Sequence, residues 1–166
     1  MYNFNYVRPA SLADAAKALG ASADAKIVAG GQTLLPTMKQ RLAQPSDLVD
    51  LGGIAELKGI KVDGNTLTIG AMTTHNDVAH SADVKKTIPA LAALAEGIGD
   101  PQVRNRGTIG GSISNNDPAA DYPSSLVALN ATVTTNKRKL AAEEFFKGLF
   151  ETALGAGEIV TAVSFP

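Results

Sequence analysis

Apolar residues recur at strand and helix spacings in alternating blocks over the first fifty positions. Residues 11–20 are rich in alanine and predict a helix, whose first backbone N–H groups Ser11 can cap. Short apolar runs at 26–29 and 48–51 predict two strands, and the helical spacing at 34–42 lies between them. We therefore expect a βαβ unit with a right-handed crossover.

The pattern changes after residue 53. Alternating apolar residues on both sides of Asp63-Gly64-Asn65 predict a β-hairpin. Further helices are predicted at 74–80, 89–98, 118–129 and 141–154, and further strands at 132–135 and 159–165. Residues 100–107 have the composition of a polar loop, and residues 108–116 alternate around paired glycines, so we expect no regular helix in either segment.

These elements predict an α+β fold with two lobes. Residues 1–53 would form a small βαβ lobe, and residues 54–166 a larger lobe with a mainly antiparallel sheet. No linker or repeat separates the two segments, so the lobes should share an interface. Interfaces of this kind are preferred places for ligands.

Composition then excludes several classes of protein. The 166 residues contain no cysteine, so disulfides, iron–sulfur ligation and thiolate metal sites within this chain are excluded, and two histidines make a multi-histidine site improbable. The formal net charge of −1 offers no basic surplus for nucleic acid. No apolar run is long enough to span a membrane, and residues 1–9 do not resemble a signal peptide, so we expect a cytoplasmic protein.

The first chemically informative segment follows the strand predicted at 26–29. Gly30-Gly31 lies between this strand and a helix, and Gln32 and Thr33 add polar side chains. Glycine permits positive φ and close approach of a ligand, and backbone N–H groups at the start of a helix favour anions. The segment lacks the spacing of a dinucleotide fingerprint or a P-loop, so a simple chain reversal remains an alternative to a phosphate site.

A second glycine-rich segment covers residues 104–123. Three glycines (Gly107, Gly110 and Gly111) are surrounded by threonine, serine and asparagine. Two such segments could hold the two ends of one pyrophosphate through N–H groups. Replacing Gly110 and Gly111 by valine is then expected to abolish binding without unfolding the chain.

Several motifs in the same order resemble the FAD-binding subunit of the molybdenum hydroxylases. They are Ala-Gly-Gly-Gln-Thr-Leu-Leu-Pro at 29–36, Gly-Ala-Met-Thr-Thr-His at 70–75, Arg-Asn-Arg-Gly-Thr-Ile-Gly-Gly-Ser at 104–112 and Asp-Pro-Ala-Ala-Asp-Tyr-Pro at 117–123. This family includes the medium subunit of carbon monoxide dehydrogenases and the flavin domain of xanthine dehydrogenase. The opening residues 4–12 and the closing residues 158–166 also fit.

The resemblance implies a two-lobed FAD-binding fold of the flavin-linked oxidase and dehydrogenase (PCMH) type, with FAD between the lobes. The positions that match the family's cofactor contacts are Val28, Ala29, Gly30, Gly31, Gln32, Thr33, Leu34, Ile98, Thr108, Ile109, Gly110, Gly111, Ser112, Asp121, Val160 and Thr161. Ser112 stands where many members have asparagine. Members also continue beyond the strand matched by 159–166 into a C-terminal domain, which we expect to be absent here.

Other polar and aromatic residues have simpler interpretations. His75 and His80 are five residues apart and would lie on different faces of a helix, so a metal site is not expected. His75 is interpreted as a hydrogen-bonded residue at the helix start, with a place near the cofactor as the alternative, since it closes one of the family motifs. Asp117 is interpreted as a helix cap. Phe145, Phe146 and Phe150 are predicted in the core, and Tyr122 is the tyrosine best placed to touch a flavin ring. No residue is assigned a catalytic role.

The leading hypothesis is an oxidoreductase subunit that holds FAD. By resemblance, electrons would pass from the molybdopterin subunit through an iron–sulfur subunit to this FAD and on to an external acceptor. One alternative is a stand-alone flavin reductase of the same fold. Another is a non-catalytic nucleotide-binding or assembly module.

Overall fold

The computed structural model describes residues 1–166, and its N-terminal part is a small parallel sheet. The strands are β1 (Asn5–Val7), β2 (Lys26–Val28) and β3 (Asp47–Asp50), in the order β1-β3-β2 with both pairings parallel. The predicted βαβ unit is therefore present. Strand β1 was not predicted, because all three of its side chains are exposed and it shows no apolar alternation.

Two helices flank this sheet in sequence. Helix α1 (Leu12–Gly20) begins as predicted, since the Ser11 hydroxyl accepts a hydrogen bond from the Asp14 N–H. Helix α2 (Leu34–Lys39) connects β2 to β3 and is shorter than predicted. Two short 3₁₀ helices, η1 (Leu51–Gly53) and η2 (Ala55–Leu57), then lead into the second half of the chain.

The larger sheet has five strands in the order β4-β5-β10-β6-β7, and all neighbouring pairs are antiparallel. Its strands are β4 (Ile60–Asp63), β5 (Thr66–Gly70), β6 (Thr132–Thr135), β7 (Lys139–Ala141) and β10 (Val160–Phe165). The predicted hairpin joins β4 to β5 through a turn in which Gly64 has φ 57°. The last strand, β10, lies at the centre of the sheet, between β5 and β6.

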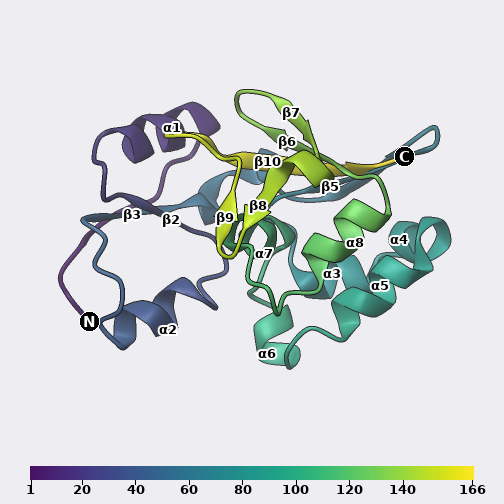
Figure 1. Ribbon diagram of the computed structural model, residues 1–166, viewed down its shortest axis with the longest axis horizontal. Helices are drawn as coiled ribbons and strands as arrows, with labels where there is room; N and C mark the ends of the chain where they lie inside the picture. The colour runs from purple at the N-terminus through teal and green to yellow at the C-terminus, as the bar shows by residue number, and fades with distance from the viewer.

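Helices gather on one side of this sheet (Figure 1). They are α3 (His75–His80), α4 (Ala82–Thr87), α5 (Pro89–Glu96), α6 (Pro101–Arg104), α7 (Ile109–Asn115), α8 (Tyr122–Ala128) and α9 (Ala142–Phe145). All of these helices except α6 contribute buried residues, together with β5, β6 and β10, to one cluster of 20. None of these helices is long and apolar enough to cross a membrane.

The helix predicted over residues 141–154 is wrong. Only α9 forms there, and it is followed by a hairpin of β8 (Phe146–Gly148) and β9 (Glu151–Thr152). Phe145 is fully buried, but Phe150 at the hairpin tip is 59% exposed, so it does not belong to the core. The Asn116 side chain donates to the carbonyls of Gly148 and Glu151, which holds the hairpin against the end of α7.

Smaller differences have local causes. Helix α4 was not predicted, and the segment expected as a polar loop contains α6, which starts because the Asp100 carboxylate accepts from the Val103 N–H. Helix α8 begins four residues later than predicted. Asp117 does accept a hydrogen bond at the Ala119 N–H, but it closes a turn before the helix rather than capping it.

The core of the N-terminal part includes residues from the second half of the chain. Leu57, Met72 and Ile159 pack with Ala15 of α1 and Val49 of β3 in a cluster of seven buried residues. The two sheets are therefore joined by shared apolar contacts. The division of the chain into lobes at residue 53 remains a prediction.

Candidate functional site

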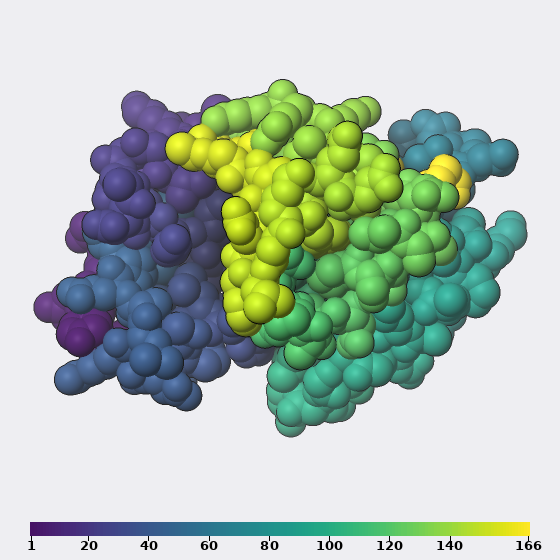
Figure 2. Space-filling view, in the orientation of Figure 1, coloured from purple at the N-terminus to yellow at the C-terminus, as the bar shows by residue number.

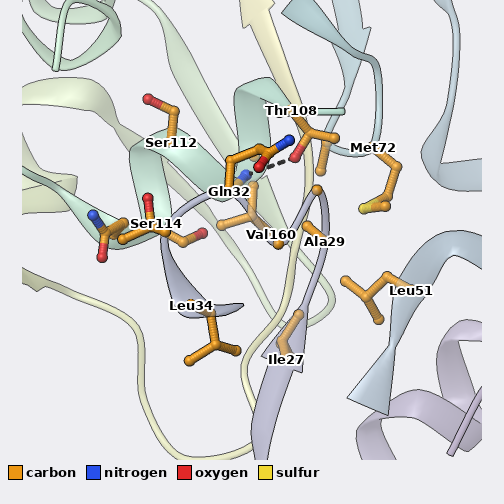
Figure 3. A pocket seen from close by; sticks show the side chains of 18 of the residues that line it. Ile27, Ala29, Gln32, Leu34, Leu51, Met72, Thr108, Ser112, Ser114 and Val160 are labelled. Atoms are coloured by element: carbon orange, nitrogen blue, oxygen red, sulfur yellow. Dashed lines mark hydrogen bonds between the residues drawn. The ribbon is translucent and has the colours of Figure 1, made fainter. Parts of the chain in front are cut away.

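A cavity of about 670 Å³ lies between the N-terminal segment and the rest of the chain. Much of its lining comes from three segments: the loop after β2, the start of α7, and Leu154 with residues 158–160 before and at the start of β10 (Figure 3). In the space-filling view the C-terminal segment, coloured yellow, lies along the boundary between the N-terminal residues and the remainder (Figure 2). The volume is in the range of about 300–1,000 Å³ usual for small-molecule and cofactor sites.

Twelve of the sixteen residues predicted from the resemblance line this cavity. They are Ala29, Gly30, Gly31, Gln32, Thr33, Leu34, Ile98, Thr108, Gly110, Gly111, Ser112 and Val160. Four do not. The side chains of Val28 and Ile109 are buried in apolar clusters, Asp121 is exposed and accepts hydrogen bonds from Ser124 and Ser125 only through its backbone carbonyl, and Thr161 faces β6.

The loop between β2 and α2 presents backbone donors without partners. None of the N–H groups of residues 30–34 donates to a backbone carbonyl in the chain. Thr33 precedes α2, but its side chain makes no capping hydrogen bond. The loop therefore offers several N–H groups to a ligand in the cavity, and such groups suit an anion.

Both glycines of this loop are required by geometry. Gly31 has φ 75°, a conformation that other residues rarely adopt. A Cβ on Gly30 would lie 2.1 Å from the carbonyl oxygen of Arg106, so the loop backbone lies directly against the segment before α7. The two glycine-rich segments are thus in direct contact.

The second glycine-rich segment differs from its predicted structure. Residues 109–115 form helix α7, and the prediction of no regular helix there is wrong. One glycine of helix α7 is required by packing, because the helix lies close to the backbone of Ala71. A Cβ on Gly110 would lie 2.6 Å from the Ala71 carbonyl oxygen. This also contradicts the expectation that valine at Gly110 would leave the fold intact.

The N–H groups at the start of α7 are mostly used within the chain. Those of Ile109 and Gly110 donate to the carbonyls of Thr73 and Ala71, and that of Gly111 donates to the Thr108 hydroxyl at 3.1 Å. Thr108 is the N-cap of α7 and lines the cavity, as does Gln32 (both are labelled in Figure 3). This wall therefore contributes shape and side chains more than free backbone donors.

The third wall was largely missed in the sequence. Leu154, Glu158 and Ile159 line the cavity together with Val160. A β-bulge between Val160 and Ala162 lets both residues stay in register with β6, while the Thr161 hydroxyl donates to the Thr134 carbonyl and not to the cavity. The motif at 158–166 was a signal for this wall, but periodicity alone could not place the bulge.

Glu158 is the buried charged residue of this wall. Its side chain is 2% exposed and forms an ion pair with Arg138 at 2.9 Å. The hydrogen bonds from the Arg138 guanidinium, opposed by burial and assisted by the Gly155 N–H and the Thr135 hydroxyl, lower the pKa of Glu158 to about 2. The carboxylate therefore carries a fixed, neutralised charge at neutral pH.

His75 also lines the cavity, and its environment differs from the one predicted. It starts α3 with its ring beside Gly107, and its Nδ1 atom is buried without a hydrogen-bond partner. Burial lowers the pKa of His75 to about 4, so the imidazole is neutral at pH 7. The ring of Tyr122 lies 5.4 Å away, but Tyr122 is fully buried and does not line the cavity, which corrects its predicted role beside a flavin.

Apolar side chains occupy the rest of the surface. Leu51, Met72 and Ile98 lie on the cavity wall with Leu154 and Val160 (Figure 3 labels Leu51, Met72 and Val160). No group of three histidine, aspartate or glutamate side chains is arranged to hold a metal ion. The cavity thus combines a row of backbone donors at the first loop with apolar walls, a combination suited to a cofactor with an anionic linker and a flat ring.

Comparison with known families also indicates a flavin cofactor. Residues 2–166 match the family described as the FAD binding domain in molybdopterin dehydrogenase. The chain belongs to this family. FAD is therefore the cofactor of this domain, and its α+β fold is the fold of the family's solved members.

Named relatives include subunits of several dehydrogenases. The FAD-binding domain is 42% identical over 165 residues to the nicotine 6-hydroxylase medium subunit of Paenarthrobacter nicotinovorans, covering 97% of this chain and 58% of that protein. It is 43% identical over 168 residues to the carbon monoxide dehydrogenase medium chain of Hydrogenophaga pseudoflava, covering 98% and 58%.

Solved structures agree closely. Carbon monoxide dehydrogenase from Hydrogenophaga pseudoflava superposes with a TM-score of 0.97 at 43% identity, covering 99% of this chain and 59% of that one. Quinoline 2-oxidoreductase from Pseudomonas putida 86 superposes with a TM-score of 0.96 at 38% identity, again covering 99% and 59%. The FAD-binding domain thus spans a little under three fifths of the length of these relatives.

Proposed function

We propose that this domain holds FAD in a molybdenum hydroxylase complex, where electrons from the iron–sulfur clusters of a partner subunit reach the flavin and leave to an external acceptor. The observation that carries the proposal is the cavity itself, with unpartnered backbone N–H groups at residues 30–34 on one side and apolar walls on the others. The names of the relatives, which are medium subunits and chains of dehydrogenases, support a subunit over a stand-alone reductase.

In this proposal the first loop binds the pyrophosphate of FAD. Its N–H groups lie together and have no competing acceptor in the chain, so they can donate to phosphate oxygens without a change of fold. Gly31 is needed for the backbone direction, and Gly30 for contact with residue 106. Thr108 and Ser112 at the start of α7 would contribute the opposite side.

The ring would lie against the apolar wall. Burial of Ile98, Leu154 and Val160 against a flat aromatic system removes apolar surface from water and fixes the orientation of the ring. When bound, FAD supplies the redox chemistry, accepting and releasing electrons. The protein residues bind, orient and exclude water, and none of them needs to act as an acid, base or nucleophile.

The proposed partners are an iron–sulfur subunit and a molybdopterin subunit of the same complex. The chain has no cysteine of its own, so iron–sulfur clusters would have to be held elsewhere. This division is consistent with the words "medium subunit" and "medium chain" in the names of the relatives.

A flavin titration tests the proposal. Because the chain has no tryptophan, the signal to follow is the fluorescence of FAD itself, which should be quenched on binding. We expect FAD to bind with a Kd in the micromolar range or tighter, and FMN and riboflavin, which lack the pyrophosphate bridge to adenosine, to bind much more weakly. A chain that quenches neither FAD nor FMN at high micromolar concentration would not be a flavin-binding unit.

A further inference from the structure

The turn between β6 and β7 is connected by polar contacts to the segment that forms the third wall of the cavity. We infer that Arg138 and Glu158 are positioning residues of the flavin site, which hold residues 153–160 in the place where Leu154 and Val160 meet the ring. This inference rests on the proposed function and deepens it. Neither residue was expected in the site from the sequence, and Arg138 does not line the cavity.

The carboxylate of Glu158 is the centre of these contacts. Its Oε1 accepts from Arg138 Nε at 2.9 Å and from the Thr135 hydroxyl at 2.8 Å. Its Oε2 accepts from Arg138 Nη2 at 3.0 Å and from the Gly155 N–H at 2.8 Å. Each carboxylate oxygen therefore accepts two hydrogen bonds. The bidentate contact with Arg138 fixes the orientation of the carboxylate as well as its distance from the guanidinium.

Side chains of the same turn make four further hydrogen bonds to the segment. Arg138 Nη2 donates to the Ala153 carbonyl at 2.6 Å, and Lys137 Nζ donates to the Ala156 carbonyl at 2.6 Å. The Asn136 side chain donates to the Gly157 carbonyl and accepts from the Ile159 N–H. Residues 153–159 have no paired strand of their own over most of this length, so side chains of the turn replace a strand partner for them.

The consequence for the cavity follows from where these contacts fall. They fall on Ala153 and Gly155, on both sides of Leu154, and on Ile159, directly before Val160. Arg138 is half-exposed and does not line the cavity, whereas Glu158 is buried and lines it, so the ion pair ties this wall to the turn and neutralises its carboxylate. Loss of the pair should loosen one wall of the cavity and leave the loop at 30–34 as it is.

The test uses the full chain with Arg138→Met and, as a second variant that keeps the shape of the carboxyl group, Glu158→Gln. In the flavin-free protein, amide hydrogen exchange at residues 153–158 should become faster, while exchange at residues 30–34 stays unchanged. With FAD, we expect the Kd to rise about tenfold, because a charge-assisted contact that orders the wall is lost. The visible circular dichroism of the bound flavin should change as well, since it reports the surroundings of the ring.

Thr68→Val is the matched control. The Thr68 hydroxyl on β5 shares a 3.0 Å hydrogen bond with Ser164, which lies on β10 but does not line the cavity. Loss of this hydrogen bond should lower the melting temperature without changing the Kd or the flavin spectrum. Arg138→Lys keeps the positive charge but not the bidentate contact with Glu158, and its Kd for FAD should lie between those of the wild type and Arg138→Met.

The outcomes separate the two proposals. If wild-type protein does not bind FAD, the proposed function fails, and the positioning role toward flavin falls with it, whatever the exchange data show. If wild-type protein binds FAD but Arg138→Met and Glu158→Gln only melt earlier, as Thr68→Val does, with unchanged Kd and spectrum, the pair is structural alone and the inference is overturned. Unchanged exchange at 153–158 in both variants would also overturn it.

Discussion

The two glycine-rich segments look alike in sequence but use their backbones differently. Residues 30–34 leave their N–H groups without backbone acceptors, and no side chain caps the helix that follows. At the start of α7 the N–H groups of residues 109–111 donate to Thr73, Ala71 and Thr108. Glycine content therefore does not by itself indicate a ligand site, because the same residue serves an open loop in one case and close packing in the other.

The difference arises from what lies on the other side of each backbone. The backbone of Gly30 lies against the carbonyl of residue 106 and Gly31 turns the chain, and the N–H groups of their loop find no backbone acceptor. Gly110 meets the backbone of Ala71, so its neighbours find acceptors within the protein. Four experiments test this comparison.

Gly110→Val should have the largest effect on stability. Its side chain would overlap the Ala71 backbone, which cannot move aside without breaking the contact between α7 and residues 71–73. We expect a loss of at least about 3 kcal/mol in the free energy of unfolding, measured by urea denaturation. A variant that unfolds at the wild-type urea concentration would show that the second segment is as open as the first.

Acid should weaken the second segment through His75, whose backbone N–H donates to Gly107 and whose ring lies beside it. Burial lowers the pKa of His75 to about 4. In the unfolded chain the His75 imidazole is protonated near pH 6.5, whereas in the folded chain it stays neutral down to about pH 4. The free energy of unfolding therefore falls as the pH decreases from about 6.5 to about 4.

The expected loss from His75 is about 2 kcal/mol between pH 8 and pH 5. Urea denaturation at the two pH values measures it, and most of the loss should disappear in His75→Leu but remain in His80→Gln, which changes an exposed histidine. Glu158 contributes little in this range: its pKa of about 2 lies below its unfolded value, so its stabilising effect is lost only at lower pH. An equal pH dependence in wild type and His75→Leu would rule out this assignment.

Gly31→Ala tests the first loop against a turn of similar backbone geometry. Both Gly31 (φ 75°) and Gly64 (φ 57°) have positive φ, so alanine at Gly64 should reduce stability by about 1 kcal/mol. Alanine at Gly31 should cost somewhat more, because its Cβ would lie 2.8 Å from Leu35 Cδ1. Only Gly31 lines the cavity, and a Cβ on Gly64 would meet nothing within 4 Å. FAD affinity, followed by flavin fluorescence, should fall in Gly31→Ala and stay at the wild-type value in Gly64→Ala. Equal affinities in the two variants would separate the first loop from cofactor binding.

The smallest expected effects come from the two threonines that precede α2 and α7. Thr108→Val removes the cap of Gly111 and should reduce stability by about 1 kcal/mol. Thr33 makes no capping bond, so Thr33→Val should change stability by less than about 0.5 kcal/mol. Thermal unfolding of the flavin-free variants measures both values. A larger loss in Thr33→Val than in Thr108→Val would reverse the comparison.

Much of the fold could be predicted from local patterns. The capped start of α1, the βαβ unit and the hairpin at Gly64 each depend on residues close in sequence, and each formed as expected. The failures lie where distant contacts override local spacing. Residues 146–152 have helical apolar spacing but pair as a hairpin beside Asn116, and residues 109–115 contain two glycines but form a helix against Ala71.

The candidate site divides in the same way. Its ordered motifs, and the residues of the first loop and of α7 that line the cavity, were available from the sequence through family resemblance. The third wall was not, because the segment that carries Leu154 and Glu158 is held by contacts with a turn about twenty residues earlier in the chain. Asp121 and Thr161 matched the family in sequence, yet their side chains lie outside the cavity.

The sequence alone therefore determined the class of fold, the family and the two glycine-rich segments, because these depend on residue type and order. The tertiary structure decided which segment has free donors, since an N–H group is free or used according to the carbonyls that other elements bring near it. It also decided which charge stays buried, because the low pKa of Glu158 depends on Arg138 being held across the turn from it.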